Sequence, residues 1–155
     1  MNKRAALPHI TVSTVIQKDG KFLLVKEQPN GKLVYNQPAG HMENGETLLN
    51  AALRETREET CWHVKITGGL GVSQYRAPSN GLTYVRHSFA AEALHFDENA
   101  KRDPDIIDIE WLSYEEIIHK KSELRSPLVL NDIERYLKGE RMDLKFIEGY
   151  IRVSQ

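Results

Sequence analysis

Several features that would place this chain in other classes of protein are scarce or absent. Its 155 residues include one cysteine, Cys61, which excludes an intramolecular disulfide and is typical of a reducing compartment. No apolar run approaches the ~20 residues of a transmembrane helix, and the N-terminal MNKRAALPHI lacks the apolar core of a signal peptide. We therefore expect a cytoplasmic protein that does not bind a membrane.

The chain also lacks a strong charge of either sign, internal repeats and low-complexity tracts. Its formal net charge of −1 offers no electrostatic basis for binding nucleic acid. With 40% hydrophobic and 28% charged residues, it has the composition of a globular protein. We expect a single domain over residues 1–155, with a flexible N-terminus at residues 1–7, that acts as a monomer or a homodimer.

Hydrophobic patterning predicts strands that are interleaved with helices. Strands are predicted at 9–16, 21–27, 32–36, 83–94 and 107–112, and extended segments broken by glycine within 63–73. Helices are predicted at 48–60, 114–121 and 127–138. The tail after residue 139 holds apolar residues that we expect to dock on the domain, namely Leu144, Phe146, Ile147, Tyr150 and Ile151. This order of elements predicts an α/β fold with a mixed sheet.

The first predicted helix follows the turn Asn44-Gly45 and is suited to begin at a Thr47 cap. One face of it is expected to pack on the core, because its residues recur at helical spacing: Leu49, Leu53, Thr56 and Thr60. The neighbouring face carries Glu55, Glu58 and Glu59 within a single turn. Their repulsion is increased by the helix dipole, which disfavours negative charge at the C-terminal end. A compensating positive charge is therefore expected.

Two sources of that charge are open. The first is local, because Arg54 and Arg57 on the same helix can pair with Glu58 and its neighbours as an ordinary salt-bridged surface. The second is a hard divalent cation, Mg²⁺ or alternatively Mn²⁺, which binds oxygen ligands and bridges carboxylates to substrate phosphates. The acid spacing alone does not choose between them.

The wider stretch from Gly40 to Trp62 resembles the Nudix box, the signature of a family of hydrolases that cleave diphosphates linked to another group. The positions that match in type and spacing are Gly40, Glu46, Arg54, Glu55, Glu58 and Glu59. Thr56 stands where an aliphatic residue is usual, and Cys61 replaces the glycine that ends the helix. A residue with a Cβ at this point either accepts about 1–2 kcal/mol of left-handed backbone strain or ends the helix in another way.

The resemblance implies an α/β/α sandwich and a metal site. It implies that Glu55, Glu58 and Glu59 are carboxylate ligands, that the Gly40 carbonyl is a further ligand, and that Arg54 and Glu46 brace the loop against the helix. A box glutamate or an acid outside the box would then accept the proton of the attacking water. The candidates outside the box are Asp97, Glu98, Asp105 and Asp108.

The flanks narrow the resemblance to one branch. The segments 35–41 and 124–129 are similar to those of the NudJ-type bacterial phosphatases, which act on nucleoside tri- and diphosphates and on thiamine-pathway pyrophosphates. This similarity implies release of inorganic phosphate from a small-molecule substrate. Candidate substrate contacts are Tyr35, Gln37, Arg86, Arg125 and Ser126.

Each of these contacts has a structural alternative. Ser126 suits a helix cap before Pro127, Arg86 and His87 face either the cleft or solvent, and Tyr35 and Tyr75 either stack on a ring or belong to the core. His41 is not expected to bind the metal. Two rival functions also stay open: a pyrophosphohydrolase acting on ADP-ribose or dinucleoside polyphosphates, and a nucleotide-binding module that has lost catalysis.

Overall fold

The computed structural model describes residues 7–147 and 149, and within them seven strands form one mixed sheet. The sheet follows the order β3 (Val34–Asn36), β2 (Lys21–Glu27), β1 (His9–Lys18), β6 (Thr83–Phe96) and β5 (Trp62–Arg76). Two further strands lie off this path, because β4 (Ala39–His41) pairs with β1 and β7 (Ile106–Leu112) pairs with β2. The expected flexible N-terminus lies outside the described residues apart from Leu7, and so do Tyr150 and Ile151.

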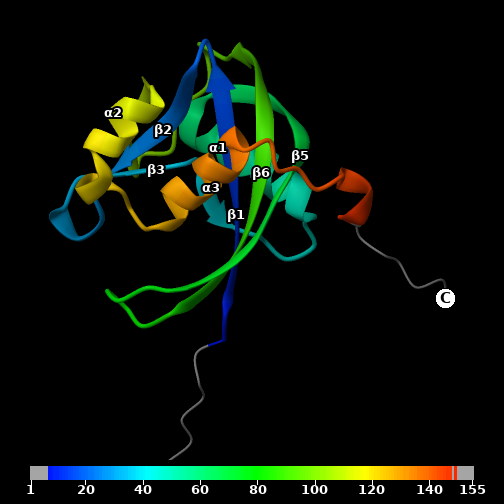
Figure 1. The fold of residues 1–155 in the computed structure, drawn as a ribbon, viewed down its shortest axis with the longest axis horizontal. Helices are drawn as coiled ribbons and strands as arrows, with labels where there is room; N and C mark the ends of the chain where they lie inside the picture. The colour runs from blue at the N-terminus through cyan, green and yellow to red at the C-terminus, as the bar shows by residue number, and fades with distance from the viewer. Residues whose placement is uncertain (1–6, 148, 150–155) are drawn as a thin grey trace, which may run out of the picture.

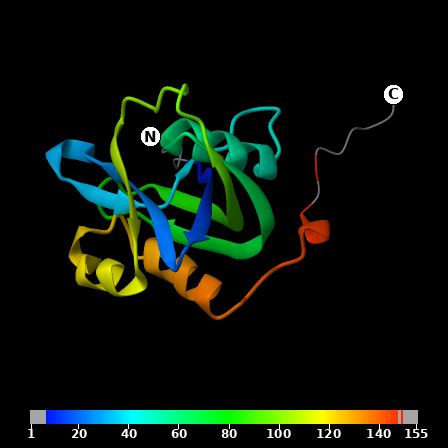
Figure 2. The same cartoon turned by 90° about the horizontal axis from the view of Figure 1, so that it is seen from above.

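Helices cover both faces of the sheet, which confirms the predicted α/β/α sandwich (Figures 1 and 2). The helix α1 (Leu48–Thr60) lies on one face, while α2 (Tyr114–His119) and α3 (Leu128–Leu137) lie on the other. Side chains of β1 alternate between the two layers. Val12 packs in a cluster with residues of α1, whereas Val15 packs in a cluster with residues of α2 and α3.

The sheet opens between β1 and β2, and this opening positions the functional site. The two strands leave the tight turn Asp19-Gly20, where both residues have positive φ as a two-residue hairpin requires. They pair only next to this turn, and further along β1 pairs with β4 and β6 whereas β2 pairs with β3 and β7. The divergence leaves space between the two halves of the sheet at the far ends of β1 and β2.

Two predictions made from hydrophobic patterning were wrong in part. The glycines of residues 68–71 do not break the chain into short segments, because β5 runs through them with shifts of register against β6. Gly71 has a φ of 126°, and the Arg135 guanidinium occupies the place that a side chain there would take. On α1, Thr56 and Thr60 are buried as predicted, but Leu53 is 37% exposed, and Ala51, Ala52 and Glu59 complete the buried face.

The threonine found in place of the usual aliphatic residue at position 56 has a polar partner. The Oγ1 atoms of Thr56 and Thr14 lie 2.7 Å apart, and both side chains are completely buried. Thr56 donates its own proton to the Ala52 carbonyl at 2.8 Å, so the Thr14 hydroxyl donates to Thr56. This bond joins α1 to the centre of β1.

We expect Thr56→Val to lower the free energy of unfolding by about 1–3 kcal/mol, because it leaves the Thr14 hydroxyl buried without an acceptor. The double variant Thr14→Val/Thr56→Val should recover most of this loss, since neither partner is then left unpaired. Urea unfolding of the two single variants and the double variant measures the coupling energy. Strict additivity of the single effects would contradict the assignment.

The helix α1 ends on Cys61 in the left-handed conformation, with φ 60° and ψ 11°. The first of the two alternatives therefore holds, and the residue accepts the strain that glycine avoids. Its backbone is held on both sides, because the Cys61 N–H donates to the Arg57 carbonyl at 2.8 Å and the Cys61 carbonyl accepts from the Asp97 N–H at 2.9 Å. These bonds lie beyond the glutamates, and they fix the backbone at the point where the helix ends.

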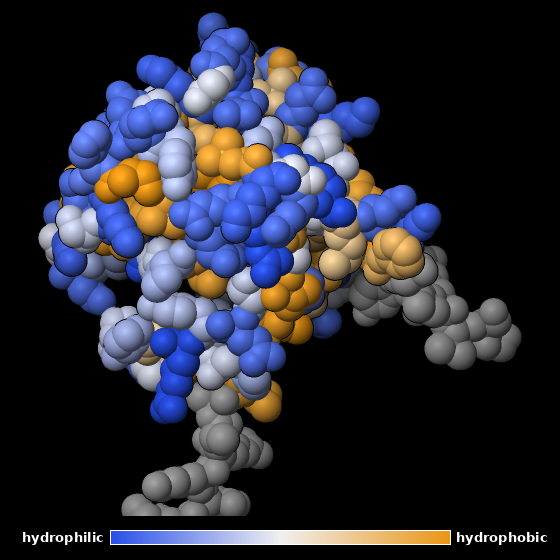
Figure 3. Space-filling model, in the orientation of Figure 1, coloured by the Kyte–Doolittle hydropathy of each residue, from blue (hydrophilic) through white to orange (hydrophobic). Residues whose placement is uncertain are grey.

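Part of the tail docks as expected. Met142 exchanges two backbone hydrogen bonds with Gly69 of β5, and Leu144 and Ile147 pack beside α1 residues, whereas Phe146 is 70% exposed. Hydrophilic residues cover most of the face in Figure 3, and the hydrophobic ones form separate groups. Among the described residues, the structure has no helix of the length and apolar character that a membrane crossing requires.

Candidate active site

The loop before α1 is fastened to the helix by a single arginine. The Arg54 guanidinium donates to the two carboxylate oxygens of Glu46 at 2.7 and 3.1 Å and to the His41 carbonyl at 3.0 Å. The hydrogen bonds from Arg54 hold the pKa of Glu46 below its usual value. The structure thus joins Glu46 and Arg54 in the bracing arrangement that the sequence predicts.

Gly40 is required by the position of Glu55. A Cβ added at Gly40 would overlap the Glu55 carboxyl group, so the loop backbone and this carboxylate are in direct contact. Arg54 donates to Glu55 at 2.9 Å, which fixes the other side of the carboxylate. Burial raises the pKa of Glu55, and the nearby charges of Glu58 and Asp103 add to the increase.

We expect Gly40→Ala to fold normally but to lose roughly 10- to 100-fold in activity. The φ of Gly40 is not positive, so the backbone tolerates alanine, and the overlapping atoms belong to the movable end of Glu55. The carboxylate must therefore turn away while the fold remains intact. Thermal unfolding and turnover, measured together, separate the two effects, and unchanged turnover would show that the position of Glu55 is not critical.

Glu59 is the most deeply buried acid of the box, with 6% of the residue exposed. Its carboxylate accepts one hydrogen bond, at 3.0 Å, from the Ala39 backbone N–H at the start of β4. Burial raises its pKa well above the usual value, and the negative charges of Glu27, Glu55 and Asp103 raise it further. Glu59 thus faces a group of acids that no neighbouring cation fully neutralises.

Glu58 is the most exposed of the three, because 46% of its side chain is accessible, and like Glu55 it accepts a hydrogen bond from Arg54, here at 3.2 Å. Arg54 therefore supplies the local compensating charge to Glu55 and Glu58, while no ion pair of Glu59 is found among the described residues. The oxygen donors suit a hard divalent cation in type and charge. They are not assembled as a finished cage, because across residues 7–147 and 149 no three Asp, Glu, His or Cys side chains are grouped to hold a metal ion.

A cleft of about 300 Å³ opens beside these acids, between the two halves of the sheet. Its walls come from the box loop, from the ends of β1, β2, β3, β5 and β6, and from the segment before α3. The lining residues are Thr11, Glu27, Asn36, Ala39, Gly40, His41, Tyr75, Ala77, Ser79, Asn80, Tyr84, Arg86, Arg125, Ser126 and Leu128. Three of the predicted substrate contacts, Arg86, Arg125 and Ser126, are therefore on the cleft wall.

Arg86 faces the cleft, and its guanidinium is held by a buried polar network. It donates to Ser13 Oγ at 2.9 Å and to Gln37 Oε1 at 2.6 Å, and it lies 3.3 Å from Asp132 Oδ2. Burial lowers the pKa of Arg86, whereas the charge of Asp132 opposes that change. The Nη1 nitrogen has no hydrogen-bond partner among the described residues, which leaves it free to bind a ligand.

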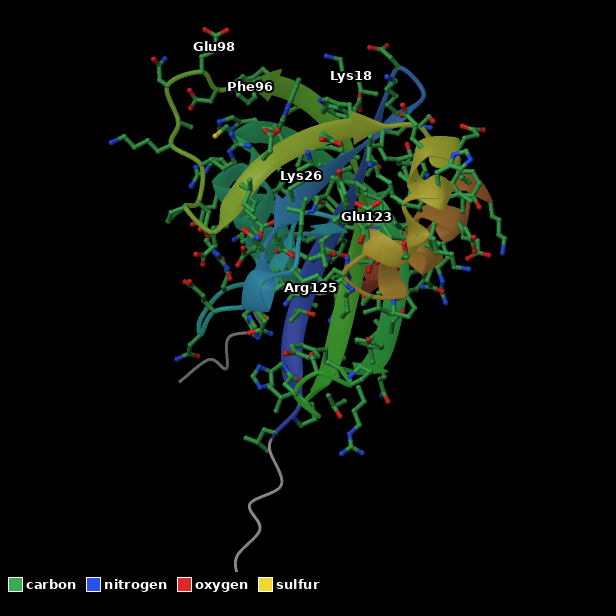
Figure 4. The ribbon with its side chains drawn as sticks, turned by 90° about the vertical axis from the view of Figure 1, so that its left-hand side faces the viewer. Lys18, Lys26, Phe96, Glu98, Glu123 and Arg125 are labelled. Atoms are coloured by element: carbon green, nitrogen blue, oxygen red, sulfur yellow. The ribbon has the colours of Figure 1, made fainter. Side chains whose placement is uncertain are left out.

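Arg125 and Ser126 also line the cleft, and they come from the segment before α3. Arg125 pairs with Glu27 at 3.2 Å, and its backbone N–H donates to the Tyr35 carbonyl. Ser126 Oγ accepts a hydrogen bond from the Leu128 N–H at 3.2 Å. This contact at the start of α3 is the helix-capping alternative to substrate binding that the sequence offers. Figure 4 shows Arg125 below Lys26 of β2.

Two predicted contacts do not line the cleft. Tyr35 is 3% exposed and packs in the core cluster that contains Phe22 and Ile117, so the core alternative applies to it. Gln37 is 1% exposed and uses its amide to join Arg86 to the Val129 carbonyl. It acts on the cleft only through Arg86. Tyr75, in contrast, does line the cleft.

Two acids outside the box lie near it besides the candidates that the sequence suggests. Those candidates, Asp97, Glu98, Asp105 and Asp108, do not line the cleft, and neither does Asp103; Figure 4 shows Glu98 at the far end of the molecule from Arg125. Glu27 and Asp103 lie near the box, because the charge of each contributes to raising the pKa of Glu59. Glu27 ends β2 and Asp103 donates its N–H to the Glu58 carbonyl. Neither position has a local sequence signal, since each depends on how distant segments pack.

Comparison with known proteins gives consistent matches to one family. The family model described as NUDIX domain matches residues 7–131. Phosphatase NudJ of Shigella boydii is 43% identical over 143 residues, covering 92% of each chain, and Phosphatase NudJ of Escherichia coli K12 is 42% identical with the same coverage. A NUDIX hydrolase from Nitrosomonas europaea has a solved structure with a TM-score of 0.90 and 39% identity, covering 93% of this chain and 98% of that one.

These matches confirm the resemblance found in the box and in its flanks. The match to the family model extends over most of the chain and includes every box residue described above. Members of the family are hydrolases that act on phosphoanhydrides and generally use divalent metal ions. On this sequence and structural evidence, the chain belongs to the Nudix hydrolase family.

Proposed function

We propose that this hydrolase releases inorganic phosphate from the terminal position of a nucleoside di- or triphosphate or of a thiamine-type pyrophosphate, with Mg²⁺ or Mn²⁺ as its metal. One observation carries the proposal: the cleft places the guanidinium groups of Arg86 and Arg125 on the same cavity as the box loop. An anionic group that enters the cleft therefore meets cations beside the acids of the box. We propose that residues 1–155 act as one domain, as a monomer or a homodimer.

The two arginines suit different tasks. Arg86 is anchored by Ser13, Gln37 and Asp132, so its free Nη1 is presented at a fixed point and costs little entropy when it binds a phosphate oxygen. Arg125 is 46% exposed and is tied to Glu27 by one contact, so it can follow the phosphate as it enters. Phosphate binding by both residues would hold the terminal group against the box loop.

Glu55, Glu58, Glu59 and the Gly40 carbonyl would hold the metal in this proposal. A divalent cation bound there would neutralise charge on the diphosphate oxygens and lower the pKa of water. The chain prepares this site, because Arg54 orients Glu55 and the Ala39 N–H orients Glu59. Asp103, which lies close enough to raise the pKa of Glu55 and Glu59, is the acid outside the box that we propose to accept the proton.

The experiment is a panel of diphosphate compounds assayed for released products with Mg²⁺, with Mn²⁺ and with excess chelator. We expect orthophosphate to be released from nucleoside tri- and diphosphates or from a thiamine-type pyrophosphate, and we expect the chelator to abolish it. Release of a nucleoside monophosphate from ADP-ribose or from a dinucleoside polyphosphate would favour the first rival. Binding without turnover of any compound would favour the non-catalytic module.

A further inference from the structure

Asn36 has a buried acceptor that the fold does not use. The residue ends β3, where its backbone pairs with Val25 of β2, and it is 7% exposed on the wall of the cleft. Its Oδ1 atom has no hydrogen-bond partner among the described residues. His87 Nδ1 is the other such side-chain atom in the described structure, and His87 does not line the cleft. A buried polar atom without a partner is rare and costly unless a ligand or water supplies one.

The environment of Asn36 accounts for the orientation of its side-chain amide. Asn36 and Glu27 both line the cleft, and the Asn36 amide lowers the Glu27 pKa against the larger increase caused by burial. An amide can lower that pKa only by donating its N–H to the carboxylate. The opposite orientation would bring the amide oxygen against the carboxylate, so the N–H faces Glu27 and the buried Oδ1 is left without a partner among the described residues.

We propose that Asn36 Oδ1 accepts a hydrogen bond from the organic part of the substrate, and that it thereby selects substrates with a neutral donor at this point. This inference rests on the function proposed above and extends it to the group that carries the phosphates. The donor is an amino group of a heteroaromatic ring or a hydroxyl of a sugar. Both present the same chemistry to the amide oxygen.

Other ligands fit this acceptor less well. Phosphate oxygens are acceptors and cannot supply a proton. A metal cation would lie near Arg125, which pairs with Glu27 beside Asn36, and near Arg86, whose charge also acts on Glu27. Two guanidinium groups oppose a cation at this point, whereas they do not oppose a neutral N–H or O–H donor. The cleft also holds Tyr75 and Tyr84, which provide flat surfaces for a ring.

The experiment measures binding to the full chain with excess chelator, so that the result does not depend on turnover. Titration calorimetry compares ATP with purine riboside triphosphate, which lacks the amino group, and with 2′-deoxy-ATP and 3′-deoxy-ATP, which each lack one hydroxyl. We expect one of these analogues to bind the unaltered protein about tenfold or more weakly than ATP. The analogue concerned identifies the donor as amino or hydroxyl.

Asn36→Leu introduces a side chain of similar size that has no acceptor. It should reduce the ratio of the analogue's dissociation constant to that of ATP to near one. Asn36→Asp keeps an acceptor oxygen and should keep the preference, and Asn36→Ala replaces the leucine variant if that variant does not fold. Asn99→Leu, in an exposed loop, is the matched control. If Asn36→Leu weakens the binding of ATP and of all its analogues equally, Oδ1 binds water and the inference is overturned. The inference is also overturned if the unaltered protein binds ATP and all the analogues with the same affinity. Failure of the proposed function is separate, since it appears as binding without phosphate release when metal is restored.

Discussion

Glu59→Gln is expected to lower metal-dependent phosphate release by about 10²- to 10⁴-fold while the protein stays folded. Glutamine keeps an oxygen that accepts the hydrogen bond from Ala39, but it removes the negative charge from the group formed with Glu27 and Glu55. A loss of metal affinity and of charge stabilisation follows. Initial rates at several metal concentrations measure the effect, and higher metal should restore only part of the activity.

Stability provides the control for this prediction. A buried carboxylate with a raised pKa is more costly when charged than when neutral, so glutamine should leave the free energy of unfolding unchanged or slightly higher at neutral pH. Glu58→Gln should also lose turnover, because Glu58 belongs to the same proposed ligand set. Glu98→Gln should not, since Glu98 lies far from the cleft (Figure 4). Full turnover in Glu59→Gln, or in the unaltered protein with excess chelator, would refute the metal site.

The largest effect on stability is expected for Asp132→Ala, which should lower the free energy of unfolding by about 3–5 kcal/mol. Asp132 is 1% exposed and Arg86 is 5% exposed, so the substitution leaves a guanidinium buried without its charge partner. It also removes the acceptor for Ser88 at 2.7 Å. The corresponding fall in melting temperature is about 10 °C for a chain of this size.

A second variant separates stability from function at this site. Arg86→Met/Asp132→Leu should regain much of the lost stability, because no charge is then buried alone. Its activity should stay low, because the cleft has lost the Arg86 guanidinium. Asp108→Ala serves as the matched control, since its contact with Arg102 is of similar length, 3.4 Å, but half exposed, and it should change stability by less than about 1 kcal/mol. A fully active double variant would exclude Arg86 from substrate binding.

The predictions from sequence were confirmed where short-range spacing decides the structure. Thr47 caps α1 by accepting from the Asn50 N–H, and Ser113 forms a capping box with Glu116 at the start of α2. In the same way, most of the seven residues between Glu46 and Arg54 belong to the first turns of α1, and the chain has little freedom to hold the pair apart. The prediction failed for Leu53, because the helix buries small residues against β1 and β5 and turns the larger side chain outward.

The sequence by itself determined the family, the box with its Glu46 and Arg54 brace, the turns and caps, and the layered α/β class. Only the tertiary structure decided which residues surround the cleft. It buried Tyr35 and Gln37, brought Glu27 and Asp103 to the box, and joined Arg86 on β6 to Asp132 on α3. The physical reason is that these contacts depend on strand register and on where β1 and β2 separate, and both arise from the packing of segments that are distant in the chain.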